Sequence, residues 1–481
     1  MTIMSLNFSI VWLWILILNA LISILLIILE RKKPEKTIAW LLVFVLLPPI
    51  GLILYVFLGR NWKKYKLNSE LVYPLKKISP YNQTKINCIE YELLMNLLAN
   101  NNNSPLYTNN DITIFNNGED KFQSLKEEIK KAKNHIHLEY YIVKNDTIGN
   151  EIKKLLIEKA KVGITVKFII DRVGSIKLGK DYVKALRLAG VDVVYYSYFL
   201  APILSLINTQ INYRNHRKIV VIDGNVGFLG GMNIGDEYLN KGKMGYWRDT
   251  HILVKGDFVG GLQKAFLHDF YTIKRIDDNS FSCTNKHNEF FPKFEGSNGS
   301  LMQIIKSGPD SEYPSIMQGI LNMITIAKSN IYITTPYFVP PESIMDALKV
   351  AALSGIDIKI LVPGRYDHLI VYYASRTYLA ELLRCGVKIY TYNKDAFIHS
   401  KTMTVDGKIS TIGTANMDIR SFELDYEINA VIYDEKIANQ LESIFRDDIN
   451  SSVEMTLETY ANTSKSIKCL EALFRVFSSL L

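Results

Sequence analysis

The chain has 481 residues, of which 48% are apolar, and a formal net charge of +8. This length allows about three domains of ordinary size. The four cysteines (Cys88, Cys283, Cys385 and Cys469) are scattered without motif spacing, which predicts reduced thiols rather than a disulfide framework. The modest positive charge suits anionic lipid and nucleic acid equally well, so charge alone identifies no partner.

Two apolar stretches dominate the N-terminus. Phe8–Leu29 carries no charged residue and is long enough to cross the hydrocarbon core as a helix. Thr37–Gly59 is also uncharged but is interrupted by Pro48, Pro49 and Gly51. No basic residue precedes the first stretch, and it is longer than the core of a signal peptide. The pattern predicts a transmembrane helical hairpin, with a re-entrant hairpin and a buried soluble hairpin as the alternatives.

Basic residues around these stretches predict their orientation. They lie between the two stretches and after the second one, at Arg31, Lys32, Lys33 and Lys36, and at Arg60, Lys63, Lys64, Lys66, Lys76 and Lys77. Two spans return the chain to its starting side, and the positive-inside rule slightly favours the cytoplasm for the part that follows. We therefore expect a multi-pass protein of the cell membrane, with an anchor over residues 1–66 and a connector over 67–110.

After the connector the chain repeats itself. Three pairs of segments resemble one another in the same order, namely 132–141 and 327–336, 162–171 and 354–363, and 189–193 and 385–389. In both copies, amphipathic helical patterns alternate with β-branched strand runs. This predicts two pseudo-symmetric α/β halves, each a mixed β-sheet flanked by helices. We place the halves at 111–276 and 301–481, with a linker at 277–300 and a C-terminal amphipathic helix from Lys465.

Each half carries the same constellation of polar residues, and the asparagine follows the histidine by 17 residues in both. A histidine and a lysine two residues apart on a strand point to one side. Glycine after each aspartate (Gly224 and Gly407) predicts a hairpin turn, so that the next strand returns the asparagine beside the histidine. The two copies are, in the same order, His216, Lys218, Asp223 and Asn233, and His399, Lys401, Asp406 and Asn416.

An imidazole, an ammonium and a carboxamide on one face suit a phosphoryl group, because they offer a nucleophile together with donors for the phosphate oxygens. A phosphodiester also needs a separate acid for the leaving alcohol, which one copy cannot supply. The two halves are therefore expected to pack with pseudo-two-fold symmetry and to bring both motifs into one cleft. No metal is expected, because His-x-Lys is not a ligand pair and the lysines already supply positive charge.

Both copies resemble the His-x-Lys-x4-Asp signature of the phospholipase D superfamily, including its Gly-x-x-Asn extension. The chain as a whole resembles bacterial cardiolipin synthases, most specifically at residues 58–61, 214–218, 230–238, 246–251 and 413–422. One departure is Asp425, because that family usually has asparagine before the aromatic residue and glutamate. An acid there is expected to alter the donor chemistry near an anionic substrate without removing activity.

The resemblance implies a phosphatidyltransferase that converts two phosphatidylglycerol molecules into cardiolipin and glycerol, reversibly and without a nucleotide or other cofactor. In that reaction one neutral histidine attacks phosphorus to form a phosphatidyl-histidine, and the other moves protons. Since imidazole has an unperturbed pKa of about 6.5, small shifts can hold one ring neutral and the other charged. By resemblance His216 is the nucleophile and His399 the acid and base, although the symmetry of the repeat favours neither.

The resemblance also implies roles for the remaining site residues. Asp249 is expected to orient His216, and Glu427 is expected to orient His399. Asp223 and Asp406 are expected to fix the hairpins and the lysines rather than to touch substrate. The groups expected to hold the substrate phosphate are Lys218, Lys401, Asn233 and Asn416.

Other functions share these motifs. A membrane-bound phospholipase D, which hydrolyses phospholipids or transfers phosphatidyl to another alcohol, remains the alternative, since motifs do not fix the acceptor. The apolar N-terminus argues against a nuclease, and two intact motifs argue against a lipid-binding scaffold. The expected partners are therefore phosphatidylglycerol, cardiolipin and the bilayer, without nucleic acid. An apolar insertion at Tyr198–Ile207, just before His216, reads either as a buried helix or as a lip that dips into the membrane interface.

Overall fold

The computed structural model describes residues 25, 34–47, 50–51, 54–55, 91–196, 213–277, 290–292 and 299–476. The chain divides into two compact units, one of residues 1–65 and 197–213 and the other of residues 66–196 and 214–481. In the first unit, α2 (Pro34–Leu46) carries Trp40 and Phe44, whose rings pack with Tyr55. Among the described residues, no helix combines the length and the apolar character needed to cross a membrane. Apart from Leu25, the first predicted span lies outside the described residues, as does the insertion at 198–207.

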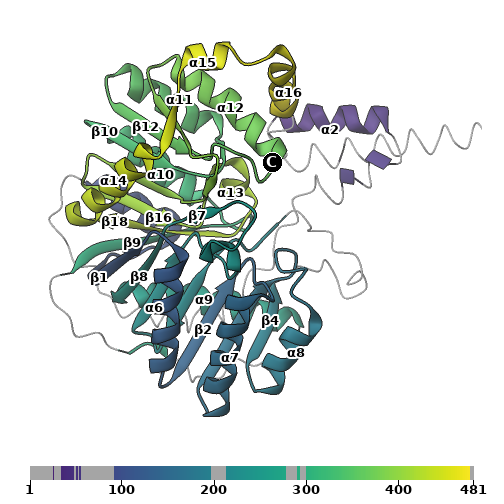
Figure 1. The fold of residues 1–481 in the computed structure, drawn as a ribbon, viewed down its shortest axis with the longest axis vertical. Coiled ribbons are helices and arrows are strands. Elements are labelled where there is room, and N and C mark those ends of the chain that lie inside the picture. Colours follow the sequence, from purple (N-terminus) through teal and green to yellow (C-terminus); the bar gives the residue numbers. More distant parts are fainter. Residues whose placement is uncertain are drawn as a thin grey trace, which may run out of the picture. The chain divides into compact units, whose positions relative to one another are not determined.

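The larger unit contains both repeats (Figure 1). Its first half follows α5 (Glu92–Asn102) and consists of β1 (Tyr107–Phe115), α6 (Gly118–Lys131), β2 (His135–Tyr140), α7 (Thr147–Lys161), β3 (Thr165–Asp171), α8 (Lys180–Leu188), β4 (Asp192–Tyr196), β5 (Ile219–Ile222), β6 (Val226–Gly230), η4 (Asp236–Leu239), β7 (Tyr246–Arg248), β8 (His251–Gly256) and α9 (Phe258–Asp277).

The second half repeats this order with additions at its end. It consists of β9 (Ser300–Ser307), α10 (Ser315–Thr325), β10 (Asn330–Thr334), β11 (Phe338–Val339), α11 (Glu342–Leu353), β12 (Asp357–Val362), α12 (Leu369–Leu383), β13 (Lys388–Tyr392), β14 (Ala396–Ile398), β15 (Thr402–Val405), β16 (Ile409–Gly413), β17 (Met417–Asp418), α13 (Ile419–Glu423), β18 (Glu427–Tyr433), α14 (Glu435–Asn450), β19 (Ser452–Met455), α15 (Leu457–Ala461) and α16 (Lys465–Val476).

The predicted mixed sheets are confirmed, and they join into one sheet of 15 strands. The first half contributes the order β1-β8-β6-β5-β2-β3-β4, and the second contributes β9-β18-β16-β15-β10-β12-β13 with β19 at its edge. These are the same order in corresponding strands, so β1 and β9, which pair antiparallel, mark the pseudo-two-fold relation. In each half the first crossovers are parallel and the strands nearer the junction are antiparallel.

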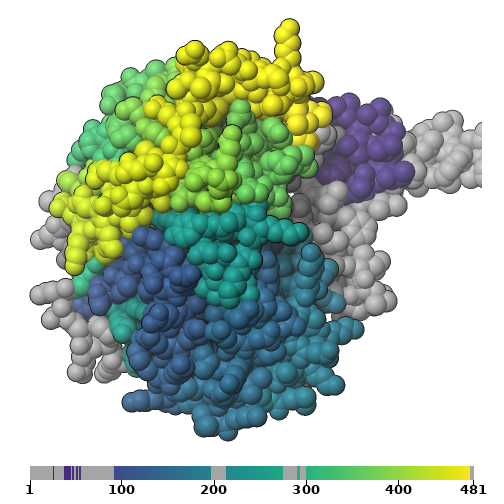
Figure 2. All heavy atoms as spheres, in the orientation of Figure 1, coloured from purple at the N-terminus to yellow at the C-terminus, as the bar shows by residue number. Residues whose placement is uncertain are grey.

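Apolar packing explains why the halves stay together. Strands such as β5, with the sequence Ile-Val-Val-Ile, are buried at every position, as expected for strands covered by helices on both faces. One core cluster combines residues of both halves beneath α9 and α14, including Ile219, Leu229 and Ile252 from the first and Ile412, Ile428 and Leu441 from the second. In Figure 2 the blue and teal surface of the first half meets the green and yellow surface of the second.

Two peripheral helices pack on the second half. α5 buries Leu94 and Leu98 in the core of the second half, and β1 begins at Tyr107, within the predicted connector. α16 packs against α12, where Arg376 bonds Glu471 and the rings of Tyr373 and Phe474 lie 6.2 Å apart. The predicted C-terminal helix is therefore confirmed over residues 465–476.

Candidate active site

The two halves exchange backbone contacts at the histidine motifs. β7 of the first half pairs in parallel with β14 of the second, and His399 N donates to the carbonyl of Arg248 at 2.7 Å. In the symmetric position, Asn215 forms a parallel bridge with Tyr426, whose carbonyl accepts from His216 N at 3.0 Å. Each histidine therefore lies beside a segment of the other half. The residue that follows this contact is an acid, Asp249 in one segment and Glu427 in the other.

This exchange decides which carboxylate meets which ring. Nδ1 of His216 lies 2.8 Å from Oε1 of Glu427, and Nδ1 of His399 lies 2.8 Å from Oδ2 of Asp249. The predicted pairing of Asp249 with His216 and of Glu427 with His399 is wrong. The two acids are the expected ones. Because the segment before each acid pairs in parallel with the other half, each acid contacts the histidine of the other half.

Each imidazole also packs on aromatic rings. Tyr141 stands edge-on to His216, with the ring centres 4.9 Å apart, and Tyr337 stands edge-on to His399 at 6.3 Å. Trp247 adds a second ring near His399, at 5.7 Å. Only 12% of the His216 side chain and 9% of the His399 side chain are exposed, so packing and the carboxylate together fix each ring.

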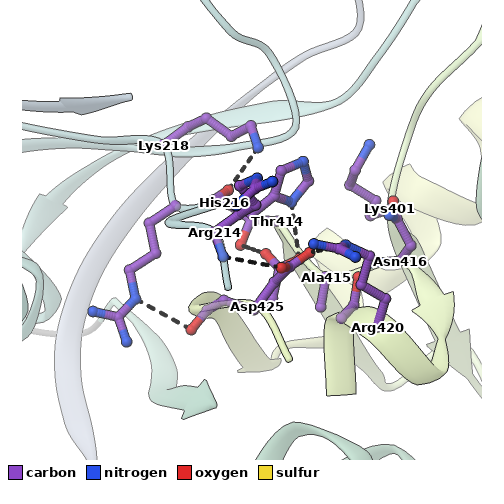
Figure 3. A network of polar contacts seen from close by, with 12 residues as sticks. Arg214, His216, Lys218, Lys401, Thr414, Ala415, Asn416, Arg420 and Asp425 are labelled. Atoms are coloured by element: carbon purple, nitrogen blue, oxygen red, sulfur yellow. Dashed lines mark hydrogen bonds and ion pairs between the residues drawn. The ribbon is translucent and has the colours of Figure 1, made fainter. Parts of the chain in front are cut away.

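The lysines of both motifs are buried beside their histidines. Lys218 Nζ donates to the carbonyl of His216 at 2.6 Å, and Lys401 Nζ donates to the carbonyl of His399. Lys401 Nζ also lies 2.8 Å from Nδ1 of His399, so these residues and Asp249 form one cluster. Figure 3 shows His216 with Lys218 on one side and with Lys401 and Asn416 on the other. Burial lowers the pKa of Lys218 to about 7 and that of Lys401 to about 8.

The electrostatic surroundings of the two histidines differ. Burial and the charges of Lys218 and Lys401 hold the pKa of His216 well below its usual value. Burial and Lys401 also lower the pKa of His399, but Asp249 opposes this shift. Burial raises the pKa of Glu427 to about 7, although Lys218 and the Thr414 hydroxyl, which donates to it, stabilise its ionised form. The pair of His399 and Asp249 is thus the better suited to hold an extra proton.

The two asparagines are placed differently. Asn233 Oδ1 accepts from the backbone N–H of Ile142 at 3.1 Å, and its Nδ2 donates to the Tyr238 hydroxyl at 3.3 Å. Its amide thus ties the end of β6 to the segment after β2. Asn416 Oδ1 is buried and has no hydrogen-bond partner within the described part of the chain. A phosphate oxygen accepts hydrogen bonds, so only the Nδ2–H groups of these amides could bind it, and the unpaired Oδ1 of Asn416 does not favour one asparagine over the other.

The aspartates of the motifs lie at the far ends of their hairpins. Asp223 and Asp406 have positive φ values of 53° and 56°, as do the glycines after them, so the predicted hairpin turns are confirmed. The Asp223 carboxylate accepts three backbone N–H groups at residues 133–135, and Asp406 accepts three at residues 328–330. Each acid clamps its hairpin to the start of the neighbouring strand. Neither bonds its lysine, which instead bonds the histidine carbonyl.

Sequence reasoning missed two buried arginine–aspartate pairs beneath the site. Arg217, between His216 and Lys218, forms an ion pair with Asp269 of α9, and its Nε donates to the carbonyl of Glu427 at 3.3 Å. The arginines stand inside the family-like strings, but nothing in the sequence marks their aspartate partners on α9 and α14.

The second pair underlies the other half of the site. Arg248 binds Asp448 of α14 through Nε at 3.1 Å and Nη2 at 2.9 Å, and its Nη1 donates to Thr250 Oγ1 at 3.0 Å. Thr250 Oγ1 in turn lies 2.6 Å from Ser400 Oγ, between His399 and Lys401. Each arginine–aspartate pair thus holds the backbone next to one of the two histidine–carboxylate contacts.

Asp425, the departure noted in the sequence, is buried beside the His216 half of the site (Figure 3). Its Oδ2 lies 3.1 Å from Nε of Arg420, and its Oδ1 accepts from Arg214 N at 3.3 Å. Burial raises the pKa of Asp425 to about 7 despite these partners. The charge of Asp425 raises the pKa of Lys218, so the residue acts on the site electrostatically.

Two repeated halves that each bring a His–Lys motif to a shared site define the phospholipase D class of proteins. A family profile described as "Cardiolipin synthase, PLD-like domain" matches residues 125–244 and 320–449, and one described as "Phospholipase_D-nuclease N-terminal" matches residues 10–60. The chain belongs to the cardiolipin synthase family.

Curated relatives agree with this assignment. The chain is 40% identical over 486 residues to the cardiolipin synthase of Listeria innocua, covering 97% of this chain and 98% of the relative. It is 43% identical over 468 residues to that of Geobacillus kaustophilus, covering 95% and 91%. The structure of phosphatidylserine synthase from Haemophilus influenzae superposes with a TM-score of 0.57 at 16% identity, over 81% of this chain and 98% of that one, which supports the fold alone.

Proposed function

We propose that the protein transfers a phosphatidyl group between two phosphatidylglycerol molecules and so produces cardiolipin and glycerol. The observation that carries this proposal is the pair of crossed histidine–carboxylate contacts, each beside a buried lysine, at one site. Full-length similarity to cardiolipin synthases supports the choice of lipid substrate.

The first step uses the difference between the two histidines. His216, held neutral by burial and by nearby lysines, attacks phosphorus through Nε2, while Glu427 holds its Nδ1 proton. The bond between phosphorus and the glycerol oxygen breaks as His399, stabilised in its charged form by Asp249, donates its proton to that oxygen. The products of this step are glycerol and a phosphatidyl group on His216.

The second step reverses the first with a new alcohol. The terminal hydroxyl of a second phosphatidylglycerol gives its proton to His399, and its oxygen attacks phosphorus as the bond to His216 breaks. One phosphoester replaces another, so the exchange is nearly balanced and needs no nucleotide. Lys218, Lys401, Asn233 and Asn416 are the groups that we assign to the phosphate oxygens, where a bound anion favours the charged form of each lysine.

The membrane setting is part of the proposal. Residues 8–29 and 37–59 are uncharged, and the profile match over residues 10–60 covers nearly all of the first stretch and the whole of the second. We assign them to a two-span anchor within residues 1–66 that keeps the catalytic halves, near 111–276 and 301–481, at the cytoplasmic surface.

The apolar insertion at 198–207 stays a prediction as an interfacial lip. If it dips into the bilayer, changing Phe199→Ser together with Leu200→Ser should reduce activity on bilayers more than on short-chain micellar lipid, because each buried side chain contributes roughly 1.5–3 kcal/mol. Equal loss on both substrates, with a large fall in melting temperature, would assign the stretch to the core.

Lipid analysis of the purified full-length protein tests the activity. With phosphatidylglycerol as the only lipid, and with a chelator but no nucleotide, cardiolipin and glycerol should appear in equal amounts. Phosphatidic acid as the main product would identify a hydrolytic phospholipase D instead, because water would then be the second acceptor.

A further inference from the structure

A tyrosine and an aspartate are hydrogen-bonded to each other on the His399 side of the site. Tyr337 lies between β10 and β11 and stands edge-on to the His399 ring. Its hydroxyl donates to one oxygen of Asp367, and the other oxygen accepts the backbone N–H of His368 at 2.7 Å. These two bonds fix the carboxylate, and 21% of the Asp367 side chain remains exposed.

This carboxylate acts on the catalytic groups. The charge of Asp367 raises the pKa of both His399 and Lys401, so it lies within electrostatic reach of the proton donor and of the phosphate site. A carboxylate has about four lone-pair positions, which leaves room for two hydroxyl donors beyond the bonds from Tyr337 and His368. Asp367 is therefore an acceptor that is both partly exposed and rigidly held.

The corresponding region beside His216 has a different character. Asp171, which ends β3 near Tyr141, is buried and accepts backbone N–H groups from residues 173, 174 and 215. Burial and the charges of Asp171 and Asp425 raise the pKa of Tyr141 to about 12, and the charges of Arg214 and Arg420 oppose this shift. The His216 side thus holds buried acids, one of them paired with Arg420, whereas the Asp367 carboxylate on the His399 side is partly exposed to solvent.

We propose that Asp367, held in place by Tyr337, is the subsite that binds the free hydroxyls of the glycerol head group. The inference rests on the proposed function, in which His399 protonates the departing glycerol oxygen. The two remaining hydroxyls of that glycerol then donate to Asp367. In the second step the middle hydroxyl of the acceptor lipid takes the same place, while its terminal hydroxyl faces His399.

A shared subsite explains how one site can bind both the leaving glycerol and the head group of the attacking lipid. Both are glycerol units with their reacting oxygen at His399, and both carry a hydroxyl on the next carbon. A monohydric alcohol lacks that hydroxyl and leaves Asp367 without a partner. An ammonium head group is the competing occupant of a carboxylate, and the experiment must separate the two.

A competition between alcohols tests the subsite. Full-length protein in mixed micelles receives phosphatidyl-p-nitrophenol, whose leaving group has no glycerol hydroxyls, with equal concentrations of glycerol, 1-propanol and ethanolamine. The measured quantity is the ratio of phosphatidylglycerol to phosphatidylpropanol. Because all products arise from one phosphatidyl-enzyme, partial unfolding of a variant cancels from the ratio.

Glycerol should be strongly preferred by the unmodified protein. Asp367→Ala and Asp367→Asn should lower the ratio about tenfold or more, a change of about 1.4 kcal/mol. Tyr337→Phe should lower it less, because the carboxylate stays. Asp346→Asn, at an exposed acid of α11, is the matched control and should leave the ratio unchanged.

Two results would overturn the subsite. The first is an unchanged ratio in both Asp367 variants, which would leave the residue only a structural role at the start of α12. The second is a selective loss of phosphatidylethanolamine, which would assign the carboxylate to an ammonium group. Production of cardiolipin from phosphatidylglycerol alone is measured separately, so failure of the proposed function and failure of the subsite are distinguishable.

Discussion

Removing Arg248 should damage both the stability of the protein and one half of its site. The guanidinium joins β7 of the first half to Asp448 on α14 of the second, and both side chains are nearly inaccessible, with exposed fractions of 5% and 11%. Its backbone carbonyl receives the N–H of His399, and the next residue, Asp249, orients that ring. Arg248→Met keeps much of the side-chain volume but removes the charge.

The expected magnitude follows from the partner left behind. Breaking a buried ion pair by removing one member typically costs about 3–5 kcal/mol, because the remaining charge loses its compensation. Burial already raises the pKa of Asp448 in the intact pair. Without Arg248 this carboxyl should take up a proton more readily in the folded state, so the loss of stability should shrink as the pH falls.

A double-mutant cycle separates the ion pair from simple packing. Asp448→Leu is combined with Arg248→Met, and the free energy of unfolding is measured for the four proteins by denaturant titration. The double variant should recover most of the loss, because replacing a buried pair by apolar side chains is often neutral or stabilising. A double variant as unstable as Arg248→Met alone would refute this reasoning.

Activity gives a second readout that general destabilisation does not imitate. If Arg248 positions the proton donor, Arg248→Met should slow reaction with phosphatidylglycerol much more than with phosphatidyl-p-nitrophenol, whose leaving group needs little protonation. Arg217→Met, beneath the nucleophile, should slow both substrates by similar factors. Equal losses on the two substrates for Arg248→Met would contradict a role in positioning His399.

Further predictions concern the covalent step and the pH profile. His399→Ala should let a phosphatidyl-enzyme accumulate in mass spectra, whereas His216→Ala should form none, and a phosphatidyl group found on residue 399 of the unmodified protein would reverse the roles. Asp425→Asn should move the alkaline limb of the pH–rate profile to lower pH, because the ionised carboxylate raises the pKa of Lys218 and its loss lets that lysine deprotonate earlier. An unmoved alkaline limb would show that Lys218 does not control it. Asp406→Ala should lower the melting temperature with little change in the glycerol-to-propanol ratio, because its carboxylate bonds the backbone at residues 328–330.

Much of the fold could be predicted from the internal repeat of the sequence. The alternation of helices and strands in each half and the turns at Asp223 and Asp406 were readable from periodicity and from Asp-Gly pairs, because these signals are local. The continuous sheet was not readable, because it depends on the pairing of β1 with β9, about 190 residues away in the chain. No local pattern records such a partner.

The site shows the same division between local and distant information. Both motifs and both orienting acids were identifiable, yet the assignment of acids to histidines failed. β7 and β14, which set the crossing, have three residues each and carry no periodic pattern of their own. The bond between Arg248 and Asp448 likewise joins residues 200 positions apart. The residue types indicated which groups are reactive, whereas the contacts between them became visible only in the folded structure.

The crossed carboxylates bear on how such a protein can originate and diversify. A lone half would hold a histidine and an acid that belong to different pairs, so it could complete a pair only by associating with a second copy of itself. Identical copies would build identical pairs. Tandem fusion frees each repeat to drift, and here one pair uses aspartate and the other glutamate. A substitution of an acid in one repeat then changes the surroundings of the imidazole in the other repeat. Selection therefore acts on the two repeats together.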